Sequence, residues 1–171
     1  MVTDSQGIHG VAASDFRGGG MIDWYGAMAW VGYLNSSRYL GQNTWSLPAA
    51  DPVCGAAYNC TNSQLGSLFY SSLGGVANTS NIPIHTSYSL FTNIQNGTYW
   101  SGTEYAPYTS VASWVFLLGY GYQSAWGKIS GIYSWVMLPG NVSTIAAVPE
   151  PGEWTMMLAG FGLIGVIARR R

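Results

Sequence analysis

Charged side chains are scarce in this chain of 171 residues, because Asp, Glu, Lys and Arg together make up only 8% of it. An average soluble domain holds roughly 25%. Three of the six basic residues end the chain, so residues 1–168 hold three basic residues against seven acidic ones. Binding to nucleic acid requires clustered Lys and Arg that neutralise phosphates. The sequence therefore argues against nucleic acid as a partner.

Residues that bind metals or catalyse reactions are equally sparse. The two histidines, His9 and His85, lie far apart in the sequence, and Asp51 and Glu104 are the only carboxylates in residues 25–147. Calcium sites usually need several carboxylates, and no Ser-His-Asp arrangement is visible. We therefore expect a protein that is not an enzyme and that holds no metal and no cofactor.

Aromatic residues, by contrast, are abundant. Phe, Trp and Tyr make up 15% of the chain, and 23 glycines imply many turns. Disordered chains are poor in aromatics and rich in charge, so this composition predicts a folded protein. Ser, Thr and Asn supply the polarity that charges usually supply, as they often do on exported proteins.

The C-terminal segment combines a short motif, an apolar run and a basic end. Residues 141–147 form a linker of small residues, Pro149, Glu150 and Pro151 follow it, and residues 154–168 contain no charge. A helix of that length rises about 22 Å, less than a hydrocarbon core of roughly 30 Å. We predict a single, marginally short transmembrane helix with its arginine cluster in the cytoplasm; the alternative is a buried core helix with a solvated tip. Its apolar and anchoring residues are Trp154, Leu158, Phe161, Leu163, Ile164, Ile167, Arg169, Arg170 and Arg171.

This order of elements closely resembles a PEP-CTERM sorting signal over residues 148–171. Such signals occur on exported proteins of Gram-negative bacteria that make exopolysaccharide. The resemblance implies that Val148, Pro149, Glu150 and Pro151 form the motif recognised by an exosortase. It also implies that the chain is a single-pass intermediate in the inner membrane and then reaches the cell surface or the extracellular matrix.

The N-terminal residues do not match a signal peptide, which has a basic start and an apolar stretch. Residues 1–20 are polar and rich in glycine. We interpret them as the poorly ordered remnant of a truncated N-terminus.

Residues 21–140 make up the body of the protein, and their sequence predicts a small α+β domain. Asp23 is a plausible N-cap for a helix over residues 24–35. Thr61 and Gln64 fit a capping box that would start a second helix ending near Leu73. Trp, Tyr and Val favour strands, and they recur between glycines further on. The predicted strands of this aromatic-rich antiparallel sheet cover residues 98–103, 112–118, 122–129 and 132–138.

Two motifs in the body resemble the Lcl-type C-terminal domain, which is thought to have a C-type-lectin-like fold. The matching residues are Trp45, Leu47, Pro48, Tyr99, Trp100, Ser101, Thr103, Glu104 and Tyr105. The chain departs from the family pattern at Ser46, where an arginine is usual, and at Ala49, where a threonine is usual. The resemblance implies an extracellular domain and a polysaccharide-binding or adhesion role.

Cys54 and Cys60 are the only cysteines. In an oxidising compartment we expect them to form a disulfide that closes a small loop and contributes about 2 kcal/mol. The alternative, reactive cysteines of a formylglycine-generating type of enzyme, would need an electropositive cleft or a metal.

The aromatic residues around Glu104 allow two interpretations. Tyr99, Trp100, Glu104 and Tyr105 could form a ligand patch for extracellular polysaccharide. The competing interpretation is a core strand in which Trp100 is buried and Glu104 pairs with a backbone donor or with Lys128. These observations leave three hypotheses for the body. The first is a polysaccharide-binding module, the second is a structural matrix protein without a discrete ligand, and the third, less favoured, is an enzyme.

Overall fold

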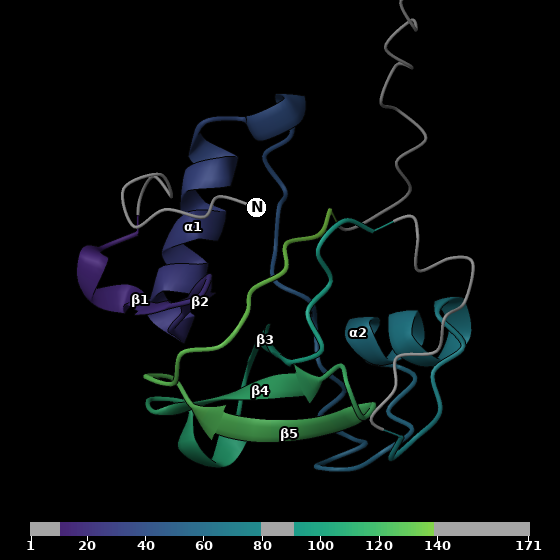
Figure 1. Cartoon of the computed structure of the whole chain (residues 1–171). Helices are drawn as coiled ribbons and strands as arrows, with labels where there is room; N and C mark the ends of the chain where they lie inside the picture. The colour runs from purple at the N-terminus through teal and green to yellow at the C-terminus, as the bar shows by residue number, and fades with distance from the viewer. Residues whose placement is uncertain (1–10, 80–90, 139–171) are drawn as a thin grey trace, which may run out of the picture. The chain divides into compact units, whose positions relative to one another are not determined.

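The computed structural model describes residues 11–79 and 91–138 (Figure 1). Within these ranges the α-helices are α1, Trp24–Ser36, and α2, Gln64–Ser67. The strands are β1, Phe16–Gly18; β2, Met21–Ile22; β3, Thr98–Glu104; β4, Ala112–Leu117; and β5, Tyr122–Gly127. Strands β1 and β2 form one antiparallel pair, and β3, β4 and β5 form an antiparallel sheet in that order. The predicted α+β class with two short helices is confirmed.

Helix α1 begins where its local sequence predicts. The Asp23 Oδ1 atom accepts a hydrogen bond from the Gly26 amide at 2.9 Å, which satisfies an otherwise unpaired donor of the first turn. Gly26 would have weakened an isolated helix. Here it is required by packing, since a Cβ at this position would lie 2.8 Å from the Cβ of Asp15.

Residues 11–20 differ from the poorly ordered remnant expected from the sequence. Ala13–Asp15 form a 3₁₀ turn, and β1 pairs with β2. Arg17 forms a 3.0 Å ion pair with Asp23, the buried cap of α1. These contacts attach the segment to the start of α1.

The three-stranded sheet has apolar side chains buried on both faces. On one face Trp100 and Val115 pack with residues of α1 and with Leu47. On the other face Tyr99 and Phe116 pack with residues of α2 and the turn that follows it. Neighbouring residues in a strand point to opposite faces, so consecutive aromatic residues fill both cores.

The second helix starts later than predicted. Ser63, and not Thr61, is the N-cap of α2, because its Oγ accepts a hydrogen bond from the Gly66 amide at 3.0 Å. Leu68–Ser72 continue as a π-helical turn. Gly74 follows in the left-handed region with φ of 68°, which stops the helix as the sequence predicts.

The predicted strand over residues 132–138 does not form as a regular strand. Ile132 bridges to Ile22, Tyr133 to Tyr99, and Met137 to Ser46. The segment thus changes partner along its length, so no continuous ladder can form.

No helix in residues 11–79 and 91–138 combines the length and the apolar character that crossing a membrane requires. The helix predicted over residues 154–168, the sorting motif and the arginine cluster lie outside the described residues.

Candidate functional site

The structure separates the four residues of the predicted ligand patch. Tyr99 is 4% exposed and Trp100 is 0% exposed, on opposite faces of β3. The indole Nε1 of Trp100 donates a hydrogen bond of 3.0 Å to the carbonyl of Ile22. Both rings pack in the core, and this corrects the expectation that they form an exposed surface patch.

Glu104 and Tyr105 lie at the end of β3, where the chain leaves the core. Glu104 is exposed, and its Oε1 is 2.5 Å from the Nζ of Lys128. Tyr105 is half-buried and packs edge-on against Trp114, with ring centroids 5.1 Å apart. The side chain of Glu104 is therefore already engaged in an ion pair, as the alternative interpretation of this strand expected.

Lys128 is the unusual member of this group, because its side chain is only 4% exposed. Its Nζ donates to Glu104 and, at 2.7 Å, to the carbonyl of Thr109. The same ammonium lies 3.9 Å from the ring centroid of Trp24, which is a favourable cation–π position. A buried charge of this kind needs such partners, since leaving it unpaired is costly.

We predict that Glu104→Gln lowers the free energy of unfolding by about 1–3 kcal/mol. The substitution leaves the buried Lys128 ammonium without its anionic partner. Lys128→Met should lower the free energy of unfolding by a smaller amount, because the Glu104 carboxylate that it leaves behind is half exposed and water can solvate it. Urea unfolding of the two variants measures the difference.

Arg38→Gln is the control for these two variants, because Arg38 is an exposed cation with no side-chain hydrogen bond in the described part of the chain. It should change stability by under about 0.5 kcal/mol. A Glu104→Gln variant as stable as Arg38→Gln would show that the ion pair contributes nothing.

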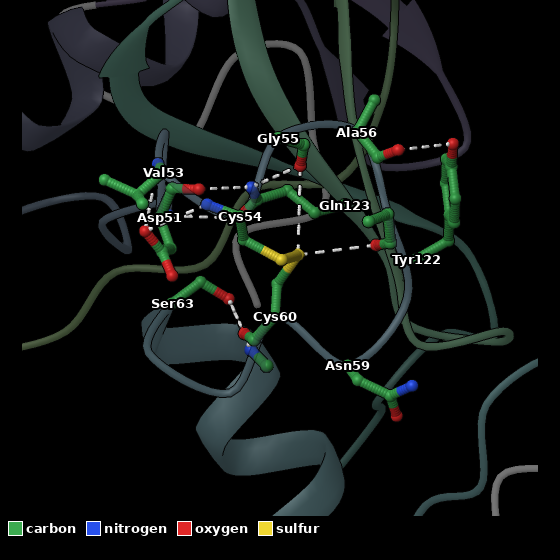
Figure 2. The surroundings of a disulfide bond; sticks show 12 residues. Asp51, Val53, Cys54, Gly55, Ala56, Asn59, Cys60, Ser63, Tyr122 and Gln123 are labelled. Atoms are coloured by element: carbon green, nitrogen blue, oxygen red, sulfur yellow. Dashed lines mark hydrogen bonds between the residues drawn. A yellow bond between two sulfur atoms is a disulfide. The ribbon is translucent and has the colours of Figure 1, made fainter.

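The predicted disulfide between Cys54 and Cys60 is confirmed, with the two Cα atoms 5.6 Å apart (Figure 2). It closes a loop that follows Asp51. The Asp51 Oδ1 atom accepts hydrogen bonds from the amides of Val53 and Cys54 at 3.1 and 3.4 Å, so the carboxylate turns the chain into the loop.

Gln123 in β5 holds this disulfide loop against the sheet (Figure 2). Its Nε2 donates to the carbonyls of Asp51 and Gly55 at 2.7 and 2.9 Å. Its Oε1 accepts from the Asp51 amide at 3.0 Å, and the side chain is fully enclosed. Sequence reasoning missed Gln123. The signal that could have found it is one neutral polar residue in a strand of aromatic and small residues.

In residues 11–79 and 91–138, no group of three or more His, Cys, Asp or Glu side chains could hold a metal ion. His9 and His85 lie outside these ranges.

Comparison with known protein families finds the PEP-CTERM protein-sorting motif at residues 147–171. The match begins one residue before the segment that the sequence predicts, and both end at Arg171. Comparisons with curated proteins and with solved structures find no match. The motif supports export of the chain and its processing by an exosortase.

Proposed function

We propose that an exosortase sorts this protein to the cell surface or the extracellular matrix, and that its body acts there as a polysaccharide-binding or adhesion module. The observation that carries the proposal is the sorting motif at residues 147–171. The Lcl-type, lectin-like assignment of the body stays a prediction from the two motifs around Trp45 and Trp100.

The physical character of the C-terminal segment suits such a signal. Pro149 and Pro151 lack amide donors, and proline disfavours a helical backbone at the residue before it, which suits docking in a protease-like groove. Residues 154–168 would hold the chain in the inner membrane while it is processed. The arginines at the end would keep that terminus in the cytoplasm and place the body outside.

The body has a feature that fits an oxidising compartment. Its two cysteines are paired in one disulfide, and disulfides form and persist outside the cytosol. Since both cysteines are used in this way, the enzyme alternative lacks the reactive thiol that it requires. This argues against an enzyme that depends on a reactive thiol.

The structural-matrix alternative remains a second candidate because Tyr99 and Trp100 are buried. Their burial removes the centre of the ligand patch predicted from the sequence. A binding role for the body then requires another surface.

The sorting proposal is tested by the intact mass of the protein from its native host. We expect the mass of the C-terminal segment to be lost when the exosortase is present and retained when it is deleted. A double variant, Pro149→Ala with Pro151→Ala, should retain most of the segment in the wild-type host. Arg38→Gln in the body serves as the control and should be processed normally. An intact C-terminus in both hosts would overturn the proposal.

A further inference from the structure

A cleft of about 280 Å³ opens between α1, the segment before β3, and residues 133–136. Its volume approaches the lower end of small-molecule sites, which hold about 300–1,000 Å³. Aromatic side chains dominate its lining and come from four separate parts of the chain. They are Trp30, Phe91, Tyr99, Tyr133 and Trp135.

These rings support one another. The ring centroid of Trp135 lies 5.3 Å from that of Phe91 and 5.8 Å from that of Tyr99. The ring centroids of Tyr133 and Tyr99 are 5.6 Å apart. Because Tyr99 is anchored in β3, the half-buried rings of Phe91, Tyr133 and Trp135 are arranged on a rigid base.

Three neutral polar residues and four small or aliphatic ones make up the rest of the lining, and none of the described lining residues is charged. Thr92 and Asn93 are exposed at the opening. Ser134 is half-buried, and its Oγ is a buried atom without a hydrogen-bond partner in the described part of the chain.

We propose that this aromatic cleft binds a neutral saccharide. The flat C–H face of a sugar ring packs against aromatic rings, and its hydroxyl groups both donate and accept hydrogen bonds, as the exposed side chains of Thr92 and Asn93 also do. A uronate or sulfate group would lose its hydration against the described lining residues, which include no cation. The inference rests on the binding role proposed for the body and assigns it a site and a ligand class.

A proline-rich peptide is the competing occupant, because aromatic grooves also bind extended proline helices. Such a peptide presents mainly carbonyl acceptors, since each proline lacks an amide donor. The hydroxyl and amide groups of the cleft match a ligand that donates as well as accepts. The chemistry of the lining therefore favours the saccharide, and the peptide becomes an outcome of the test.

The test uses the full-length chain in lipid nanodiscs. The probes are a neutral β-glucan oligosaccharide and a neutral mannan oligosaccharide, with heparin, polygalacturonate and a polyproline peptide for comparison. Tryptophan fluorescence and calorimetry measure binding. We expect at least one neutral probe to bind, and Trp135→Ala to weaken its binding at least about tenfold. Trp126→Ala on β5 is the control, because Trp126 is partly exposed and lies outside the cleft lining.

A second pair of variants removes a polar group without disturbing the backbone. Asn93 and Asn59 both have a positive φ, of 63° and 60°, so glycine fits either position. Asn93→Gly should weaken saccharide binding about threefold or more, whereas Asn59→Gly should leave it unchanged. Unchanged melting curves would show that both variants are folded.

Three results would overturn the inference. In the first, the wild-type protein binds neither neutral probe. In the second, saccharide binding survives both Trp135→Ala and Asn93→Gly, and in the third, only the polyproline peptide binds. Processing by the exosortase is measured separately by intact mass, so normal processing with any of these results overturns the cleft inference and leaves the sorting proposal standing.

Discussion

Trp100→Ala is expected to lower the free energy of unfolding by about 3–5 kcal/mol, because it empties a fully enclosed site in the core. The ring packs with residues of α1 and with Val115 in β4. Its indole also donates to the carbonyl of Ile22 in β2, which accepts a second hydrogen bond from the Ile132 amide. A small domain is stable by only about 5–15 kcal/mol, so the variant should be near the limit of folding. Urea unfolding followed by near-ultraviolet circular dichroism measures the loss.

Two further variants separate the contributions of Trp100. Trp100→Phe keeps most of the apolar volume and removes the hydrogen bond to Ile22, so it should cost about 1–3 kcal/mol. Trp126→Ala removes a ring that is 37% exposed and should cost distinctly less than Trp100→Ala. Equal losses for the two alanine variants would contradict the burial of Trp100 and return it to the surface patch.

The elements that the sequence predicted well are those specified by neighbouring residues. The start of α1 depends on Asp23, which caps the first turn across three residues. Strands β3, β4 and β5 are rich in residues that favour strands, and the turn between β4 and β5 contains Gly119 and Gly121. The sorting motif is also linear, and a family comparison finds it without reference to the fold.

The start of α2 could not be predicted with the same accuracy, because Thr61 and Ser63 are both acceptable caps. Close contacts within residues 60–66 select between them. Gly66 approaches the carbonyl of Cys60 so closely that a Cβ would lie 2.0 Å from it, and Ser63 donates to the same carbonyl. Neither contact has a signature in the local pattern.

The prediction of an exposed ligand patch was wrong for a related reason. A strand with one solvated face alternates apolar and polar residues, whereas a strand buried on both faces does not. Tyr99 and Trp100 are adjacent and are both buried, so their position in the sequence could not separate a surface platform from a core. The cleft around Trp135 joins segments that are remote in the chain, and only the fold brings them together.

Gln123→Leu is expected to lower the free energy of unfolding by about 2–4 kcal/mol, although leucine is apolar and similar in size. The substitution removes two donated bonds and one accepted bond. It leaves the amide of Asp51 and the carbonyls of Asp51 and Gly55 without these partners. Gln42→Leu is the matched control, because no hydrogen bond of the Gln42 side chain occurs in the described residues, and it should change stability by under about 0.5 kcal/mol.

Because Gln123 and the disulfide hold the same loop, their effects should not add. Removing the disulfide with Cys54→Ser and Cys60→Ser should cost about 2 kcal/mol. Without the disulfide the loop is more flexible, so the hydrogen bonds from Gln123 contribute less to stability. The triple variant should therefore be more stable than the sum of the two losses predicts, by about 0.5 kcal/mol or more. Strict additivity in urea unfolding would show that Gln123 and the disulfide stabilise the domain independently, and it would contradict the role of Gln123 as the tether of this loop.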